Sequence, residues 1–529
     1  MRCIACNSEN LKKLGMRFSG KERGLGYVCN DCDESFVVPI TATVEESQED
    51  MENNNDDLHY VRDEQFINNI TSSKKIVFTT AVNNTKINET FFKSLKSYCN
   101  LNDAQLVIFP LKYKNPSLIN SNDSSTWYDS TIEPYLVENN FEILPTLKAL
   151  GGLKTQATVE NPLSGVDGLS KGYSIIFGHP QVSLKTLPRN SEKYPAIATT
   201  TGAVTEKNYS STKAGYKAAF NHSMSAVVVE IDDDGDFFIR HLNFDGKGFY
   251  DFETYYRPNV AEMLNEPLEA IITGDEHAVF ADPEVMNATY FNNDSLVKKF
   301  KPKYIVRHDL LDFFSASHHH KHNFFLKYAK HHSNGAWSVR KELDKTINHV
   351  NITTPDFCTN IFIASNHNEH IVRWLNEADP KQDPENALLY HYLMYKILDQ
   401  TTMDDTNVRY PEPFELYASP LMKCKTKFLS RSESFKIKGV DISNHGDVGI
   451  SGSKGSSKQF SNIPVKNITG HTHTPMIDKG NYTVGTSSKF NLSYVSGLSS
   501  WDHAHCLIYP NGKRQMIFIR NGKYRAVYN

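Results

Sequence analysis

Histidine, aspartate and asparagine side chains follow short apolar stretches at five places in the C-terminal half of this 529-residue chain. The blocks are Asp275 and His277 after 268–273, Asp309 after 304–306, Asn366 and His367 after 360–364, His445 after 440–442, and His471 and His473 after 465–469. Short stretches rich in β-branched residues are typical of strands, and functional groups gather at the carboxyl ends of strands in α/β sheets. Imidazole nitrogens and carboxylate oxygens bind manganese, iron or zinc. The pattern therefore predicts a metal site at the ends of several strands.

The last block, Gly470-His471-Thr472-His473, places two imidazoles one residue apart. On an extended backbone both rings would point to the same side, because side chains alternate between faces. Such a pair is weak evidence alone in a chain with 21 histidines. Each block alone also fits an ordinary turn or cap, since aspartate and asparagine favour both. It is the five blocks in order that favour a metal centre.

This ordered set of blocks, spanning about residues 268–529, resembles the calcineurin-like metallophosphoesterase superfamily. The resemblance implies an α/β fold: a β-sandwich flanked by helices, with two divalent metal ions that are most simply manganese, with iron or zinc as alternatives. It implies that one ion is held by Asp275, His277, Asp309 and His473, and the other by Asp309, Asn366, His445 and His471, so that Asp309 bridges them. It also implies that His367 faces the substrate and assists the leaving oxygen.

The chemistry suits these residue types, because two cations about 3.5–4 Å apart lower the pKa of a water between them. The bridging hydroxide would then attack phosphorus in line. The chain departs from the family pattern at His308 and Ser365, where glycine is usual, and at Asn368, where an acidic residue is usual and Glu369 could substitute. These departures are expected to change the base of the substrate pocket and the orientation of His367, and to leave the metal ligands unchanged.

A narrower resemblance is to the large phage-encoded metallophosphoesterases. It is carried by 306–313 with nearby His319 and His320, and by 365–367 followed by 373–375, and the stretches 177–180 and 200–205 fit it as well. That group includes a protein associated with early breakdown of host DNA. The resemblance implies a metal-dependent nuclease acting on DNA in the host cytoplasm. Two alternatives stay open: a phosphatase or phosphodiesterase acting on small nucleotides, and a zinc-ribbon adaptor that binds DNA or a protein and has a regulatory metal site.

Two Cys-x-x-Cys pairs lie near the N-terminus: Cys3 with Cys6, and Cys29 with Cys32. Two such turns complete a tetrahedral zinc shell, and metal binding would supply the folding energy of so short a segment. We therefore expect a structural zinc ribbon over 1–40, with a redox-active dithiol as the alternative. Residues 41–73 begin with an acidic, asparagine-rich composition that predicts a flexible linker.

Residues 74–265 are expected to form a separate α/β domain before a catalytic domain over 266–529. The pattern predicts a strand at 75–81, a helix at 88–99 and a strand at 105–110, followed by strands at 173–177, 226–231 and 237–242. The acidic turn 232–236 is interpreted as a hairpin turn rather than a calcium loop, because it lacks the full EF-hand pattern. No motif in this region carries chemistry.

The net charge of −4 provides no global field that would recruit nucleic acid, so local basic clusters at 298–303 and 423–438 are the candidates for contacting a phosphate backbone. The sequence has no apolar run of the roughly 18–20 residues that cross a bilayer. It also lacks the apolar core of a signal peptide. We therefore expect a cytoplasmic protein without a membrane partner. A homo-oligomer is compatible with the sequence.

Overall fold

The computed structural model describes residues 3, 5–6, 8–19, 22–33, 35–39, 60–113, 126–189, 194–320, 322–404, 407–492 and 497–527. The chain divides into two compact units, Met1–His59 and Tyr60–Asn529. The first contains an antiparallel sheet of β1 (Leu11–Ser19), β2 (Glu22–Cys29) and β3 (Ser35–Pro39). None of the helices in the described part of the chain is long and apolar enough to cross a membrane.

The stretch expected to be a linker, 41–73, lies outside the described residues as far as residue 59. Its last part is not flexible, because Glu64–Thr71 forms helix α2. The Asp63 side chain caps the helix by accepting a hydrogen bond from the Phe66 N–H (2.8 Å), and Ile70 is buried in the main core. The predicted linker therefore ends in a short amphipathic helix, and this helix belongs to the second unit.

A four-stranded sheet begins the second unit, with the order β12–β11–β4–β5. Its elements are β4 (Lys75–Val82), α3 (Glu89–Leu101), β5 (Gln105–Leu111), β11 (Ser225–Ile231) and β12 (Phe237–Asn243). β4 and β5 are parallel and joined by α3, which confirms the predicted strand–helix–strand order. The helix buries Phe91, Leu95 and Tyr98 at helical spacing against the sheet.

The turn between β11 and β12 is a hairpin turn, as its sequence predicts. Its carboxylates face a lysine: the Lys523 Nζ lies 2.7 Å from Asp232 Oδ2 and 2.5 Å from Asp234 Oδ2. The acidic turn is therefore neutralised from within the chain.

A ten-stranded sheet has the order β22–β23–β24–β26–β25–β9–β10–β8–β7–β6. Its strands are β6 (Asn140–Leu144), β7 (Leu147–Leu150), β8 (Ser174–Phe177), β9 (Ser183–Leu187), β10 (Ala196–Thr200), β22 (Lys436–Ile437), β23 (Val440–Asp441), β24 (Asn467–Thr469), β25 (Met476–Asp478) and β26 (Asn481–Thr483). β9 pairs antiparallel with β25, so the regions 74–265 and 266–529 share one sheet. The structure therefore differs from two separate domains: both regions belong to one compact unit, because each supplies the edge strand that the other pairs with.

A six-stranded sheet has the order β21–β18–β17–β16–β27–β28. Its strands are β16 (Ala270–Ile272), β17 (Tyr304–Arg307), β18 (Thr359–Ile363), β21 (Thr426–Leu429), β27 (Ala504–Ile508) and β28 (Arg514–Phe518). β16, β17, β18 and β21 are parallel. One face, with Ile272 and Val306, shares a hydrophobic core with the ten-stranded sheet, whereas Ile271 and Ile305 pack on the opposite face.

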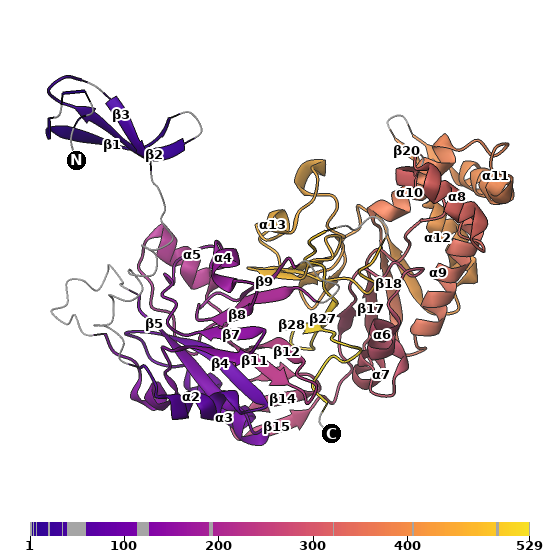
Figure 1. Cartoon of the computed structure of the whole chain (residues 1–529). Helices are drawn as coiled ribbons and strands as arrows, with labels where there is room; N and C mark the ends of the chain where they lie inside the picture. Colours follow the sequence, from indigo (N-terminus) through magenta and orange to yellow (C-terminus); the bar gives the residue numbers. More distant parts are fainter. Residues whose placement is uncertain are drawn as a thin grey trace. The chain divides into compact units, whose positions relative to one another are not determined.

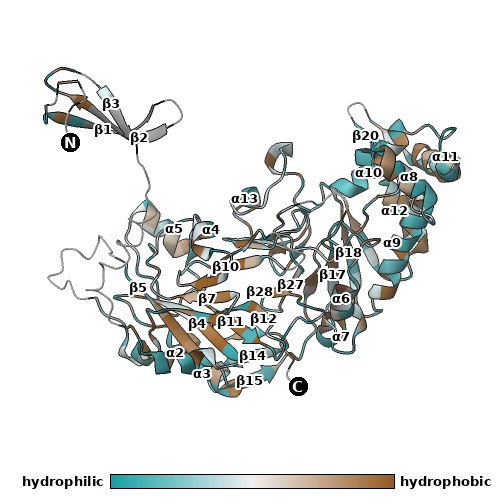
Figure 2. Cartoon of the chain, viewed as in Figure 1, coloured by the Kyte–Doolittle hydropathy of each residue, from teal (hydrophilic) through white to brown (hydrophobic). Residues whose placement is uncertain are grey.

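Helices cover that opposite face (Figure 1). They are α6 (Pro283–Met286), α7 (Leu296–Phe300), α8 (Phe324–His332), α9 (Val339–Thr353), α10 (Asn366–Glu377), α11 (Pro384–Gln400) and α12 (Pro413–Ala418). Figure 2 shows strands β4, β7 and β11 as largely hydrophobic, whereas α9 and α10 expose hydrophilic residues. The second unit is thus a mixed α/β structure of packed sheets with an outer helical layer.

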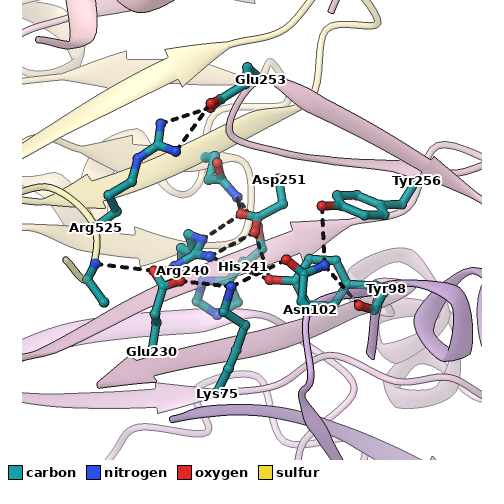
Figure 3. Close-up of polar contacts among 12 residues, drawn as sticks. Lys75, Tyr98, Asn102, Glu230, Arg240, His241, Asp251, Glu253, Tyr256 and Arg525 are labelled. Carbon is teal, nitrogen blue, oxygen red and sulfur yellow. Dashed lines mark hydrogen bonds and ion pairs between the residues drawn. The ribbon is translucent and has the colours of Figure 1, made fainter. Parts of the chain in front are cut away.

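The remaining elements include α4 (Val166–Ser170), α5 (Lys213–Asn221), α13 (Ser457–Phe460), the small sheet β13 (Phe249–Asp251), β14 (Thr254–Arg257) and β15 (Val260–Met263), and the pair β19 (Thr402–Met403) and β20 (Val408–Arg409). A buried ionic network joins the four-stranded sheet to β13 (Figure 3). Arg240 Nη2 donates to Asp251 (2.7 Å) and Nη1 donates to Glu230 (3.0 Å). Lys75 also pairs with Glu230 (2.8 Å), and the Tyr98 hydroxyl donates to Asp251 (2.8 Å).

Candidate metal centre

The five polar blocks of the sequence follow strands of two different sheets. Asp275, Asp309 and Asn366 come after β16, β17 and β18, which are parallel neighbours in the six-stranded sheet. His445 and His471 come after β23 and β24, which are parallel neighbours in the ten-stranded sheet. The carboxyl ends of the two sets meet, as the contacts below show.

The first group contains Asp275, His277, Asp309 and His473, all buried. One ligand atom from each lies within 4.8 Å of the others. His473 Nε2 is 3.1 Å from Asp275 Oδ2 and 3.0 Å from His277 Nε2. His277 Nε2 is 3.9 Å from Asp309 Oδ2. The structure therefore brings together all four residues expected to hold the first ion.

The second group lies on the other side of Asp309. His445 Nε2 is 2.9 Å from Asp309 Oδ2, and the rings of His445 and His471 lie with their centroids 5.3 Å apart. The Asn366 Oδ1 atom is buried and has no hydrogen-bond partner among the described residues. Asp309 thus contacts residues of both groups, and Asp275 also lies within 4.8 Å of His445 and His308.

These residues fit a pair of divalent cations. Besides Asn366 Oδ1, the buried oxygens Asp275 Oδ1 and Asp309 Oδ1 lack a hydrogen-bond partner in the described chain. A buried carboxylate oxygen without a donor is costly, and a bound cation removes that cost. Aspartate oxygens mixed with imidazole nitrogens suit manganese, iron or zinc. The surplus of carboxylates acts on His277 as well: burial opposes its charged form, yet Asp312 and Asp309 raise its pKa to about 9.

The structure requires glycine beside two of the expected ligands, at Gly446 after His445 and at Gly470 before His471. A Cβ on Gly470 would lie 2.2 Å from Asp275 Oδ1 and 2.9 Å from His308 Cβ, so only glycine lets this strand end approach the carboxylate. Gly446 has φ 118°, which disfavours any other residue.

The backbone of the centre is strained at four expected ligands. His277 (φ 40°), Asp309 (φ 39°), His471 (φ 71°) and His473 (φ 56°) all have left-handed conformations. Such residues cost roughly 1–3 kcal/mol each and cluster at functional sites. The surrounding backbone holds them, with the His277 N–H donating to the Asp309 carbonyl (2.8 Å).

The expectation of an extended His-x-His pair is wrong. β24 ends at Thr469, and both histidines sit in a tight turn before β25. Each imidazole therefore reaches a different group, with His473 beside Asp275 and His471 beside His445.

His367 lies at the start of α10, with its Nε2 4.0 Å from Asp309 Oδ2. Its Nδ1 donates to the Asp312 carbonyl (2.6 Å), while the Asp312 carboxylate accepts from His277 Nδ1 (2.9 Å). Burial opposes ionisation of Asp312, but this hydrogen bond from His277 holds its pKa below the ordinary value. Sequence reasoning did not assign Asp312 to the site. Its spacing of three residues after Asp309 was the available signal.

The departures from the family pattern also have structural explanations. Asn368 Oδ1 accepts from the Ser365 N–H (3.1 Å), so the two residues form a capping box for α10. Glu369 is not beside His367 but is paired with Arg431 (2.8 Å), which also binds Asp447. His308 fills the pocket floor, with its Nδ1 3.3 Å from His445 Nδ1.

The first unit contains the second metal candidate. The sulfurs of Cys3, Cys6, Cys29 and Cys32 lie within 4.8 Å of one another, with Cys3 to Cys32 and Cys6 to Cys29 both at 3.6 Å. A backbone hydrogen bond from Cys6 lowers the pKa of Cys3 to about 7. Four convergent thiols fit a tetrahedral zinc ion. By contrast, burial raises the pKa of Cys506 to about 12, as expected for an inert core thiol.

Comparison with known proteins relates the chain to a phage protein. No family model and no solved structure matches the chain. The chain is 32% identical over 474 residues to Protein A1 of Escherichia phage T5, an alignment that covers 86% of this chain and 84% of the relative. Because the similarity extends over most of both sequences, this chain belongs to the family of the phage T5 Protein A1.

Proposed function

We propose that this protein is a calcineurin-like metallophosphoesterase that hydrolyses phosphodiester bonds in DNA with two divalent metal ions. The observation that carries the proposal is Asp309, a buried carboxylate with one complete ligand group on one side and His445 on the other. The architecture supports it too, because two packed sheets with a helical layer are compatible with the β-sandwich of that superfamily.

When bound, two divalent ions would supply an activated water and would offset negative charge on the phosphoryl oxygens. The chain's own residues position that chemistry. Because His277 Nδ1 donates to Asp312, its Nε2 is the nitrogen that would bind a cation in the first group once it loses its proton. Asp309 is the carboxylate that would help to hold both ions.

His367 is proposed to protonate the leaving oxygen. Its Nδ1 hydrogen is already donated to the Asp312 carbonyl, so its Nε2 carries a proton only in the imidazolium form. That form is the one that can act as an acid. With Nε2 4.0 Å from Asp309 Oδ2, the ring lies close to the proposed bridging carboxylate.

DNA as the substrate rests on the likeness to phage-encoded metallophosphoesterases and on the kinship with a phage protein. The four-cysteine unit adds a candidate module for binding DNA or a partner protein. A phage nuclease of this kind would act on host DNA in the host cytoplasm.

The test is cleavage of linear and circular DNA with added Mn²⁺, by wild type, Asp309→Asn and His367→Gln. We expect both substitutions to abolish or strongly reduce cleavage, since general acids contribute about 10²–10⁴-fold. His391→Gln, on the exposed surface of α11, is the matched control and should cleave normally. Cleavage by Asp309→Asn at the wild-type rate would refute the proposal. Fast hydrolysis of a small phosphodiester with no cleavage of DNA would favour the small-substrate alternative instead.

A further inference from the structure

A large pocket lies away from the metal centre. Its volume is about 1110 Å³, and none of the candidate metal ligands lines it. Its walls come from α5 and the end of β12, from the segments 461–466 and 477–482, and from the turn before β28. Sites for small ligands occupy about 300–1,000 Å³, so the pocket has room for more than one nucleotide.

One wall of the pocket holds three cations that form no close ion pair with the described residues. Arg514 is only 8% exposed, and its Nη1 donates to two backbone carbonyls, those of Asn467 (2.9 Å) and Gly480 (2.8 Å). In the described part of the chain, no carboxylate lies within 4.0 Å of the side-chain nitrogens of Lys466, Lys513 or Arg514. Of the three, Arg514 is buried, Lys513 is half-buried and Lys466 is exposed. A buried cation such as Arg514 is normally paired with an acid.

The three cations also act on one another. Burial and the nearby Arg514 lower the pKa of Lys466, and burial and Lys466 lower the pKa of Lys513. Two other lysines that line the pocket are neutralised, because Lys217 and Lys479 both pair with Glu160 (3.0 and 2.7 Å). Positive charge without an ion pair is therefore gathered at Lys466, Lys513 and Arg514, and Asp245, which also lines the pocket, partly offsets the charge of Lys513.

The basic clusters picked out from the sequence are better neutralised than this wall. Lys303 and Lys438 share Glu269, at 2.8 and 3.3 Å, and Lys427 pairs with Glu433. The strongest site for an anion thus comes from residues that are scattered in the sequence.

Two aromatic side chains stand at the mouth of the same pocket. Tyr216 is 68% exposed and Phe220 is 83% exposed, both on α5. Four residues apart on a helix, they lie on the same face. Exposed rings beside positive charge are what proteins use to stack unpaired bases while holding the backbone.

We propose that this pocket binds a segment of single-stranded DNA, with its phosphates against Lys466, Lys513 and Arg514 and its bases stacked on Tyr216 and Phe220. The choice of DNA as the polyanion rests on the proposed nuclease function. The site would give the region 74–265 a role: α5 and β12 hold the strand while the metal centre acts on another part of it.

The experiment measures binding apart from cleavage. A fluorescently labelled oligo(dT) of twelve nucleotides is titrated with the full-length protein in EDTA, and anisotropy is followed at several salt concentrations. For Lys466→Gln/Lys513→Gln we expect the slope of log K against log [salt] to fall by about 1.4, since each contact to a single strand contributes roughly 0.7. For Tyr216→Ala/Phe220→Ala we expect about tenfold weaker binding with the slope unchanged, because stacking is not ionic.

The controls are Lys93→Gln and Tyr395→Ala, which remove an exposed cation and an exposed ring outside the pocket and should bind as wild type. A wild-type slope for the lysine pair would overturn the inference. So would displacement of the oligonucleotide by equimolar dTMP or phosphate, which would make the occupant a free phosphate, or duplex binding as tight as single-strand binding.

The two proposals fail separately. Asp309→Asn should bind the oligonucleotide normally without cleaving DNA. Cleavage by wild type together with undiminished binding by both pocket variants would leave the nuclease proposal standing and remove the pocket. If the pocket variants lose binding and wild type does not cleave DNA, the pocket proposal stands and the nuclease proposal is removed.

Discussion

Asp312 shows how a single residue can position two others. Its carboxylate accepts from His277 and its backbone carbonyl accepts from His367, so one turn of chain orients a metal ligand and the proposed acid. Neighbours that orient a ligand in this way tune affinity for the metal as well as geometry.

We predict that Asp312→Asn lowers the affinity for Mn²⁺ by about 10–100-fold, the usual cost of losing such a partner. The side-chain amide of this variant would still accept the hydrogen bond from His277 Nδ1. It would lack the negative charge that strengthens this bond and makes His277 a better metal ligand. Calorimetric titration with Mn²⁺ measures the change, and the exposed Asp356→Asn is the matched control. An unchanged affinity would mean that Asp312 has only a packing role.

The clustering of the expected ligands was easier to foresee than their surroundings. Expected ligands such as Asp275 and His445 follow strands directly, and the structure brings them together. Asp312 and His308 were not assigned, because their roles depend on which side chains face them across the sheets. The left-handed turn at His471 also escaped prediction, since it is imposed by the approach of Gly470 to Asp275.

At the level of elements, strands and helices with strong patterns were predictable. α3 and the hairpin β11–β12 were found from periodicity and turn residues. Helix α2 was not, because its stability comes from burying Ile70 in a core that lies elsewhere in the chain. Ion pairs between elements were not predictable either, because their partners are distant in the sequence. The network around Arg240 is the clearest case.

Arg240 joins β12 to β11 and β13 through two buried carboxylates (Figure 3). We predict that Arg240→Met destabilises the protein by about 3–5 kcal/mol, because it leaves Asp251 buried without its cation and removes one of the two cations of Glu230. Urea unfolding measures the loss. Arg257→Met breaks an exposed pair with Glu262 and should cost about 1 kcal/mol or less. Equal losses in the two variants would contradict the assignment.

Helix α12 supplies a prediction on pH. Burial raises the pKa of Glu412, at its N-cap, to about 7. A carboxyl whose pKa is raised on folding favours the folded state below its unfolded pKa, and that advantage is lost as pH rises from about 4.5 to about 7. We expect Glu412→Gln to be relatively more stable than wild type at pH 8 than at pH 4.5, as measured by thermal unfolding. The exposed Glu385→Gln should show no such trend. A constant difference across the range would show that Glu412 does not titrate there.

On the scale of the whole molecule, the division of the chain was harder to foresee. Composition suggested a boundary near residue 265, but β9 and β25 pair across it in one sheet. A strand's sequence shows that it is a strand and not which distant strand it will join. The four-cysteine unit was easier, since its four ligands are local pairs and it forms a compact unit of its own.

The independence of that first unit gives the last prediction. Cys29→Ser should remove about one equivalent of zinc, while the main unfolding transition of the second unit stays at the wild-type temperature. Metal analysis and calorimetry check this. Cys424→Ser, outside the cluster, is the control. A large fall in the main transition would show that the two units depend on each other.

The pairing of β9 with β25 also sets an order of events during synthesis. The turn with His471 and His473 leads directly into β25, which finds its partner in a strand made nearly three hundred residues earlier. Chains fold as they emerge from the ribosome, N-terminal part first. β9 is therefore made long before its partner, and the turn with His471 and His473 gains this support only when β25 has paired with β9. A chain terminated before β25 would lack this pairing, so we expect the proposed nuclease activity to appear only after β25 has been made.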